Sequence, residues 1–277
     1  RVAILFDQRP EFVFHYYALN ALGVSVVPIN PDYRVEEIHY VVEHSESSLI
    51  VGVDKRAQDL DEVVKMLGGA CSRVSFDQFP ATLPAARTAA QPGTPDYATE
   101  AALLYTSGTT GKPKGAMLTH LNIAHSVIHY EIALKLSSAD RGALAVPASH
   151  VTGLVALIAA MVHVAGTLVI VAEFKAPAFV ELLAAERISY SLMVPAMYQL
   201  CLLQPAFRTL DLSAWRVGGF GGAPMPVPTV QALAQAVPRL TLVNCYGSTE
   251  TTSPATIMPL GLSAIHHDAV GITVPCA

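Results

Sequence analysis

The residues best suited to chemistry lie between Tyr105 and Gly115, in the order Tyr-Thr-Ser-Gly-Thr-Thr-Gly-Lys-Pro-Lys-Gly. Three glycines, four aliphatic hydroxyl side chains and two lysines fall within these eleven residues. Glycine lets backbone N–H groups turn toward a ligand, the hydroxyls add hydrogen-bond donors and the lysines add positive charge. The segment also follows an apolar, strand-like run. We therefore expect a loop that wraps a polyphosphate.

Two other interpretations of this loop fit its spacing less well. A Walker A loop needs the pattern G-x-x-x-x-G-K-[ST] at the start of a helix. Here Gly108 and Gly111 are only three positions apart, and Lys112 is followed by Pro113, which has no N–H to donate. A flexible surface linker would also be rich in Gly, Ser and Thr. A linker, however, does not need two lysines around a proline.

The run from Thr106 to Gly115 resembles the signature of the adenylate-forming enzymes, which comprise acyl-CoA synthetases, peptide-synthetase adenylation domains and luciferases. The resemblance implies that the loop is mobile and holds the β- and γ-phosphates of ATP. It also implies that Lys114 is a catalytic residue. The nucleotide-binding residues that it implies in this loop are Thr106, Ser107, Gly108, Thr109, Thr110 and Gly111.

A second motif, Asn244–Glu250, follows another candidate strand and is similar to the family's Asn-x-Tyr-Gly-x-Thr-Glu. The resemblance implies that Tyr246 stacks on adenine beside Gly247. It further implies that Thr249 binds the α-phosphate and that Glu250 holds Mg²⁺, both as catalytic residues. The chemistry agrees, because Mg²⁺ prefers oxygen ligands and usually takes one or two carboxylates together with phosphate oxygens. A plain strand-end turn with a solvated Glu250 is the structural alternative.

The third motif, Phe220-Gly221-Gly222-Ala223-Pro224, looks like the family's Gly-Gly-Ala-Pro segment, whose backbone passes close to adenine and the acyl group. Two glycines after a strand permit such an approach. A Gly-Pro turn into the next helix is an alternative, and both interpretations can hold together. The resemblance places Gly222, Ala223 and Pro224 at the nucleotide, and Phe220 and Gly221 at the acyl pocket.

The segment Ser149–Leu154 resembles the motif that lines the acyl pocket of acyl-CoA ligases. A lone histidine is usually structural, but this context favours pocket contact for His150 and its neighbour Val151. Amino-acid-activating relatives carry an Asp near this point, whereas residues 149–162 contain no acidic residue. We therefore expect an apolar acyl or aryl acid as substrate. The other expected pocket residues are Val194 and Met197.

Composition excludes several classes of protein. The chain has 277 residues, of which 52% are hydrophobic and 14% charged, which is typical of a core-rich globular protein. The net charge of −5 argues against a nucleic-acid binder, so ATP must be held by local charge and oriented dipoles. Four widely spaced cysteines without a C-x-x-C pair predict neither a disulfide framework nor a metal centre, and favour the cytoplasm. His266-His267-Asp268 is interpreted as an exposed loop rather than a metal site.

One apolar run invites a membrane interpretation. Residues 142–172 contain no Asp, Glu, Lys or Arg, and 151–172 are long enough to cross a bilayer. Gly153, His163 and Gly166 interrupt the run. A buried helix over about 153–165, followed by a buried strand, explains it equally well, and no positive flank marks a membrane span. We expect no transmembrane segment.

Apolar strand-like runs alternate with helix-length amphipathic segments, which predicts an α/β fold with mainly parallel sheets flanked by helices. Ten candidate strands are many for one open sheet, so two stacked α/β subdomains are expected. We place the first at 1–138, with the phosphate loop 105–115, the second at 139–258, and a truncated tail at 259–277. The expected strands are 2–6, 25–29, 48–53, 73–76, 101–106, 143–146, 167–171, 190–194, 216–220 and 241–246. The expected helices are 10–22, 35–45, 59–66, 120–136, 178–186, 196–203 and 227–236.

The resemblance also suggests what the chain lacks. It opens inside a strand without Met, and the match runs out near Asp268–Pro275. The family continues with a Thr-Gly-Asp motif, a hinge and a small C-terminal domain carrying a catalytic Lys, so we expect a fragment that adenylates poorly. The implied reaction joins a carboxylic acid to AMP and passes the acyl group to coenzyme A. Loading of an aryl acid onto a carrier protein, luciferase-type oxidation and a non-catalytic binding module stay open, as does a homodimer.

Overall fold

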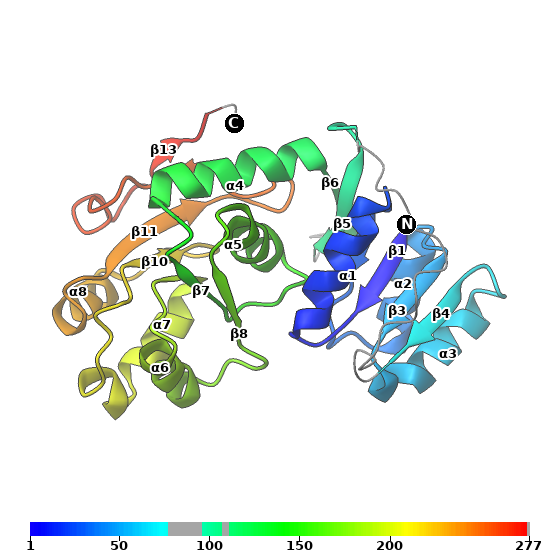
Figure 1. Ribbon diagram of the computed structural model, residues 1–277, viewed down its shortest axis with the longest axis horizontal. Coiled ribbons are helices and arrows are strands. Elements are labelled where there is room, and N and C mark those ends of the chain that lie inside the picture. The colour runs from blue at the N-terminus through cyan, green and yellow to red at the C-terminus, as the bar shows by residue number, and fades with distance from the viewer. Residues whose placement is uncertain (77–95, 107–110, 276–277) are drawn as a thin grey trace. The chain divides into compact units, whose positions relative to one another are not determined.

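The computed structural model describes residues 1–76, 96–106 and 111–275 (Figure 1). Contacts between residues divide the chain into two compact units, Arg1–Leu121 and Asn122–Ala277. Each unit is an α/β assembly around its own sheet, as expected from the alternation of strand and helix patterns.

The first unit is built on a six-stranded sheet in the order β4-β3-β1-β2-β5-β6. The first five strands in that order run parallel, and β6 pairs antiparallel with β5. Strands β5 and β6, which follow each other in the chain, are the antiparallel pair among the described strands of this sheet, and the phosphate loop connects them. The strands are β1 (Val2–Leu5), β2 (Val26–Pro28), β3 (Leu49–Gly52), β4 (Ser72–Ser75), β5 (Glu100–Thr106) and β6 (Lys114–Thr119).

Helices cover the first sheet according to the direction of each crossover. The chain passes from β1 to β2 in one direction and then returns across β1 to β3 and β4. Because such connections are right-handed, α1 lies on one face, and α2 and α3 on the other. Ile38 and Val41 of α2 and Leu60 of α3 accordingly share one buried cluster. These elements are α1 (Pro10–Ala21), α2 (Val35–His44), the 3₁₀ turn η1 (Asp54–Arg56) and α3 (Ala57–Met66).

The second unit contains a seven-stranded sheet in the order β13-β12-β11-β10-β9-β7-β8. The strands from β11 to β8 run parallel, whereas β12 and β13 add an antiparallel edge. They are β7 (Arg141–Leu144), β8 (Thr167–Ile170), β9 (Tyr190–Met193), β10 (Val217–Phe220), β11 (Thr241–Tyr246), β12 (Thr256–Ile257) and β13 (Ile272–Thr273).

The second core lies mainly between this sheet and three helices that follow successive strands. Residues of α6, α7 and α8 join Trp215 and Phe220 in one buried cluster. In the π-helical segment η2, by contrast, every residue from Gly153 to Ala159 is buried. The helical elements are α4 (His120–Leu134), η2 (Thr152–Ala159), α5 (Ala160–His163), α6 (Ala176–Ala185), α7 (Pro195–Leu202), the 3₁₀ turn η3 (Pro205–Arg208) and α8 (Val227–Ala236).

The contact boundary differs from the predicted one. The sequence places the boundary after the helix near residue 120, at 137–141, whereas the structure groups nearly all of α4 with the second unit. The physical reason is hydrogen bonding: Ser126 and Tyr130 of α4 bond to Thr252 and Ser253. A polar cluster after a helix marks the end of that helix, but it does not show which sheet the helix covers.

The apolar run of residues 142–172 forms a strand, a helical segment and a second strand, as predicted. The second strand, β8, is not buried as predicted, because it lies at the edge of the sheet and its residues are partly or fully exposed. No helix within 1–76, 96–106 or 111–275 is long and apolar enough to cross a membrane. The fold prediction of two mainly parallel sheets with flanking helices is confirmed. The edge strands β6, β12 and β13 and the π-helical geometry of η2 were not predicted.

Candidate functional site

The chemistry-bearing motifs of the second unit gather at one edge of its sheet. From β7 the chain crosses to β8 on one side, whereas from β9 it crosses to β10 on the other. Such a reversal between two adjacent parallel strands is a topological switch point, and ligands of open α/β sheets bind outside the carboxyl ends of the strands there. The loop after β7 contains His150, and β9 is followed by Val194.

The next two strands, β10 and β11, bring Gly221 and Gly222 (the glycine pair) and the motif Asn244–Glu250 (the tyrosine motif) to the same edge. In the parallel ladder, Met193 of β9 pairs with Phe220 of β10, which pairs with Asn244 of β11. The residues that follow therefore leave the sheet side by side. A Cβ atom built on Gly222 would lie 3.7 Å from Cγ1 of Val194, whose side chain is 43% exposed.

The glycine pair allows two strands to approach closely at this edge. A Cβ atom on Gly221 would lie 2.5 Å from the carbonyl oxygen of Cys245, well inside van der Waals contact. Gly222 has φ +76°, a left-handed conformation that side chains disfavour. The backbone at Gly221 therefore passes close to the end of β11, and Gly222, Ala223 and Pro224 are exposed.

The loop that carries His150 is fixed by a second close approach. A Cβ atom on Gly153 would lie 2.2 Å from the carbonyl oxygen of Pro147, so only glycine lets this loop fold back on η2. The backbone N–H of Thr152 donates to Nδ1 of His150 (3.2 Å). His150 is exposed at the surface, and the protein packed around its inner side lowers the pKa of the imidazole by partial desolvation. When the ring is neutral, this hydrogen bond to Nδ1 leaves the proton on Nε2, which can donate a hydrogen bond.

The segment after β11 presents groups suited to a nucleotide. The ring of Tyr246 is 54% exposed, so it has a face free for stacking. Thr249 is buried and Glu250 is exposed on the turn that follows. The turn closes where the backbone N–H of Ala255 donates to the carbonyl of Tyr246 (2.9 Å). An exposed carboxylate on this turn can serve a metal ion bound to a phosphate.

Helix α4 holds this turn from the side. The hydroxyl of Ser126 donates to the carbonyl of Thr252 (3.0 Å), and the buried hydroxyl of Tyr130 shares a hydrogen bond with Oγ of Ser253 (3.0 Å). Thr252 and Ser253 both have positive φ, at 57° and 29°, which costs about 1–3 kcal/mol each. The hydrogen bonds from α4 offset part of that cost. Ser126 and Tyr130 were not predicted from sequence, because each is more than 120 positions from its partner and no local pattern links residues so far apart.

Strand β10, which leads into the glycine pair, is supported from the core side. The hydroxyl of Tyr198 donates to the carbonyl of Gly219 (2.7 Å), and its ring stacks on Trp215 with centroids 5.8 Å apart. Three residues expected in the acyl pocket pack inward instead of lining open space. Phe220 and Val151 are buried, and Met197 packs against the buried cluster of α6, α7 and α8. Val194 is the exposed apolar side chain at this edge, and the pocket roles of the other three stay predictions.

The phosphate motif lies in the first unit. Thr106 pairs with Lys114, and Tyr105 with Gly115, so the β5–β6 ladder fixes both ends of the loop. Gly111 has φ +98°, and the side chain of Lys114 is exposed. The expected phosphate ligands Ser107, Gly108, Thr109 and Thr110 lie outside the described residues.

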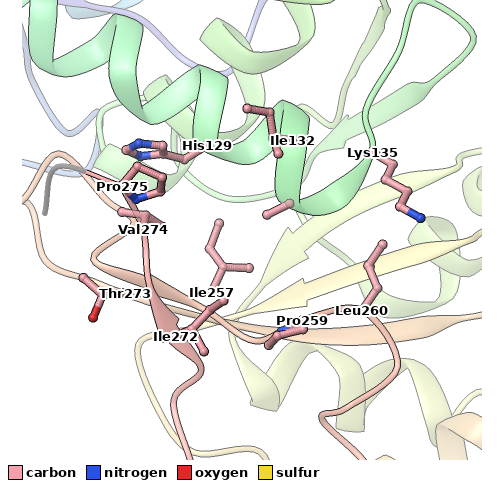
Figure 2. A pocket seen from close by; sticks show the side chains of 11 residues that line it. His129, Ile132, Lys135, Ile257, Pro259, Leu260, Ile272, Thr273, Val274 and Pro275 are labelled. Carbon is pink, nitrogen blue, oxygen red and sulfur yellow. The ribbon is translucent and has the colours of Figure 1, made fainter.

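A pocket of about 440 Å³ lies elsewhere in the second unit (Figure 2). It is formed by α4 and the β12–β13 edge, with Ile132, Ile257 and Ile272 among its lining residues. None of the residues expected to bind nucleotide or acid lines it. Across the described ranges, no group of three or more His, Cys, Asp or Glu side chains could hold a metal ion.

Comparison with known proteins identifies the family. A family model described as AMP-binding enzyme matches residues 1–277. The chain belongs to the AMP-binding enzyme family. Feruloyl-CoA synthase of an Amycolatopsis species is 30% identical to this AMP-binding chain over 256 residues, which cover 90% of the chain and 49% of that protein. Long-chain-fatty-acid–CoA ligase FadD13 of Mycobacterium tuberculosis is 28% identical over 265 residues, covering 93% and 51%.

The AMP-binding chain spans about half the length of these curated relatives. Its fold matches that of a fatty acyl-CoA synthetase from Mycobacterium tuberculosis with a TM-score of 0.86 at 23% identity, over 99% of this chain and 54% of that one. The inhibitor-bound N-terminal domain of FACL13 from the same organism gives 0.85 at 24% identity, over 99% and 69%. These likenesses establish the fold, and the family match establishes the AMP-binding class.

Proposed function

We propose that this chain provides the nucleotide- and acid-binding part of an enzyme that activates a carboxylic acid with ATP and transfers the acyl group to coenzyme A. One observation carries the proposal. The His150 loop, Val194, the glycine pair and Tyr246 follow four adjacent parallel strands at the switch point of the second sheet. The AMP-binding family and the CoA-ligase names of the relatives support it.

The proposed roles of the residues follow from their chemistry. Tyr246 stacks on adenine beside the backbone of Gly222 and Gly247. Thr249 bonds the α-phosphate, and Lys114 compensates phosphate charge. In the loop, Thr106, Ser107, Gly108, Thr109, Thr110 and Gly111 supply donors to the β- and γ-phosphates, and Ala223 and Pro224 border the base. The acid lies by His150 and Val194, with Gly221, Phe220, Val151 and Met197 shaping its site.

The activation step needs no general base. A carboxylate is ionised at neutral pH, so its oxygen attacks the α-phosphorus directly and pyrophosphate leaves. The thiol of coenzyme A then attacks the acyl carbon, releasing AMP and a proton. Because the first step brings an anion to a polyanion, the residues act by positioning and by compensating charge. Mg²⁺ fits this site through the exposed Glu250 carboxylate and phosphate oxygens, and when bound it supplies charge neutralisation.

The substrate class is an apolar acyl or aryl acid. No acidic side chain lies between Ser149 and Val162 to pair with a substrate amine. A carrier-protein acceptor is the second candidate, and it is distinguished by whether the enzyme consumes coenzyme A. We further propose a cytoplasmic setting, and that these 277 residues alone adenylate poorly. ATP–pyrophosphate exchange at rates typical of longer relatives would contradict the last point.

A thermal-shift screen of carboxylic acids in the presence of AMP tests the proposal. A ligand that binds only the folded chain stabilises it by RT ln(1 + [L]/Kd), about 2.7 kcal/mol at a hundredfold excess over Kd. We expect AMP to raise Tm, and apolar or aryl acids to raise it further. A larger rise with amino acids than with their deaminated counterparts would refute the substrate class. No rise with AMP would refute nucleotide binding by this chain.

A further inference from the structure

We infer that Tyr40 of α2 is a positioning residue. It fixes the C-terminal side of the phosphate loop, Lys112–Lys114, in the position needed to bind the β- and γ-phosphates of ATP. The inference rests on the proposed function. It concerns described residues of the first unit, and Tyr40 itself lies outside the motifs that carry the resemblance to the family. Tyr40 lies 73 positions from the loop residue that it contacts.

The first contact fixes the backbone of the loop. The hydroxyl of Tyr40 donates to the carbonyl of Pro113 (3.0 Å). Pro113 lies one position outside the last β5–β6 pair, Thr106 with Lys114. Since proline has no N–H, its carbonyl is the only backbone hydrogen-bonding group with which it can be held. Tyr40 uses that group.

The second contact fixes a positive charge. The ammonium nitrogen of Lys112 lies 5.3 Å from the centroid of the Tyr40 ring, within the range of a cation–π interaction. Ring and hydroxyl of one side chain therefore hold two consecutive residues. A long lysine side chain that is held in place loses less conformational entropy when it meets a phosphate.

A residue one turn further along the same helix contacts the N-terminal side of the phosphate loop. His44 lies four positions after Tyr40, on the same face of α2. Its Nδ1 shares a hydrogen bond with the hydroxyl of Tyr105 (2.8 Å), directly before Thr106. The rings of Tyr40 and His44 stack at 5.4 Å, and both meet Tyr105 edge-on. Helix α2 thus holds residues on both sides of the loop.

The helix itself is firmly anchored, so it can act as a rigid support. Ile38, Val41 and Val42 of α2 are fully buried in the core of the first unit. Tyr40 is half-buried beside that cluster and directs its polar end to the loop. Holding Lys112–Lys114 in this way raises the population of the binding-competent conformation. Because the apparent Kd equals the intrinsic Kd divided by that population, ATP should bind more tightly.

The test compares Tyr40→Phe with Tyr33→Phe in the 277-residue chain. Tyr40→Phe keeps the ring and removes the hydrogen bond to Pro113. Tyr33 packs against the same cluster and its hydroxyl makes none of the loop contacts described above, so it is the matched control. Hydrogen exchange by mass spectrometry follows the amides of Lys112–Ala116, and calorimetry gives Kd for ATP and for AMP.

We expect Tyr40→Phe to accelerate exchange in Lys112–Ala116 and to raise Kd for ATP about threefold to tenfold, the effect of one neutral hydrogen bond, with Kd for AMP unchanged. Tyr40→Leu, which also removes the ring, should weaken ATP binding further, and Tyr33→Phe should change neither measurement. Unchanged exchange in Tyr40→Phe would overturn the inference, and so would equal weakening of ATP and AMP. If the unaltered chain bound AMP but not ATP, the inference would fail while the nucleotide site stood. If it bound neither, the proposed function would fail.

Discussion

Asp140 supports the candidate site from the opposite edge of the sheet, and its charge can be removed without changing its size. It immediately precedes β7, while Ser189 precedes β9 and Arg216 precedes β10. Its carboxylate accepts hydrogen bonds from Arg216 Nε (2.9 Å), Arg216 Nη2 (2.7 Å) and Ser189 Oγ (2.6 Å). Arg216 also donates to the carbonyls of Leu134 and Lys135 at the end of α4. We predict that Asp140→Asn strongly destabilises the second unit.

The magnitude follows from burial. Asp140 is 3% exposed, and breaking a buried ion pair by neutralising one partner costs about 3–5 kcal/mol. The Arg216 side chain is 35% exposed, so water can hydrate its orphaned charge. We therefore expect the low end of that range, a loss of about 3 kcal/mol in the free energy of unfolding at pH 7.

The pH dependence has a definite sign. Burial alone would raise the pKa of Asp140, but hydrogen bonds from Arg216, Ser189 and the Ser137 N–H together hold it below the ordinary value of 3.8. A carboxyl whose pKa is lower in the folded state stabilises the fold above its unfolded pKa, and that stabilisation disappears as pH falls through the folded pKa. The difference between wild type and Asp140→Asn should be constant above about pH 5 and shrink below pH 3.8.

Urea denaturation followed by tryptophan fluorescence measures this difference. Trp215 is the single tryptophan of the chain, is buried, and belongs to the second unit. Glu186→Gln is the matched control, since it breaks the half-exposed pair with Arg141 in the same unit and should cost less than about 1 kcal/mol. A loss below about 1 kcal/mol for Asp140→Asn at pH 7, or an undiminished difference at pH 3, would refute the reasoning.

Three further predictions concern the edge of the second sheet. Gly153→Ala should lower Tm by several degrees, roughly the effect of 1–3 kcal/mol, because its Cβ would lie 2.2 Å from the Pro147 carbonyl oxygen; an unchanged Tm in a calorimetric scan would contradict this. Gly221→Ala should weaken AMP binding by about tenfold or more, since its Cβ meets the Cys245 carbonyl at 2.5 Å; a normal calorimetric Kd would contradict it. The imidazole of His150 should titrate below its ordinary pKa of 6.5 in an NMR pH series. The contribution of the neutral ring to the free energy of unfolding should be fully present above pH 6.5 and should decrease as the pH falls below it. A pKa at or above 6.5 would show that the ring is not desolvated.

Sequence patterns predict those parts of the fold in which apolar residues recur with the period of one element. The strands around Ile4, Ile50 and Val243 are apolar runs buried on both faces, and the structure confirms them. Strand β6 gives no such signal, because Leu118 is its only buried residue. Strands β12 and β13 have two residues each, too few for any period.

Some residues of the candidate site can likewise be predicted from sequence, and others cannot. Motifs that directly follow strands can be placed from sequence, because the carboxyl ends of parallel strands meet at one edge. Contacts between distant segments cannot: Tyr130 meets Ser253 across 123 positions, and Tyr40 meets Pro113 across 73. Phe220 also shows that a residue within a motif can pack into the core.

An NMR titration of the ¹⁵N-labelled chain with AMP tests the central claim most directly. The claim is that adenine and the α-phosphate bind at the carboxyl ends of β10 and β11. The account predicts that the largest amide shifts occur at Gly222, Ala223, Tyr246 and Gly247, with Ile132 and Ile272 in the pocket of Figure 2 unaffected. Shifts concentrated at that pocket, or none at millimolar AMP, would contradict it.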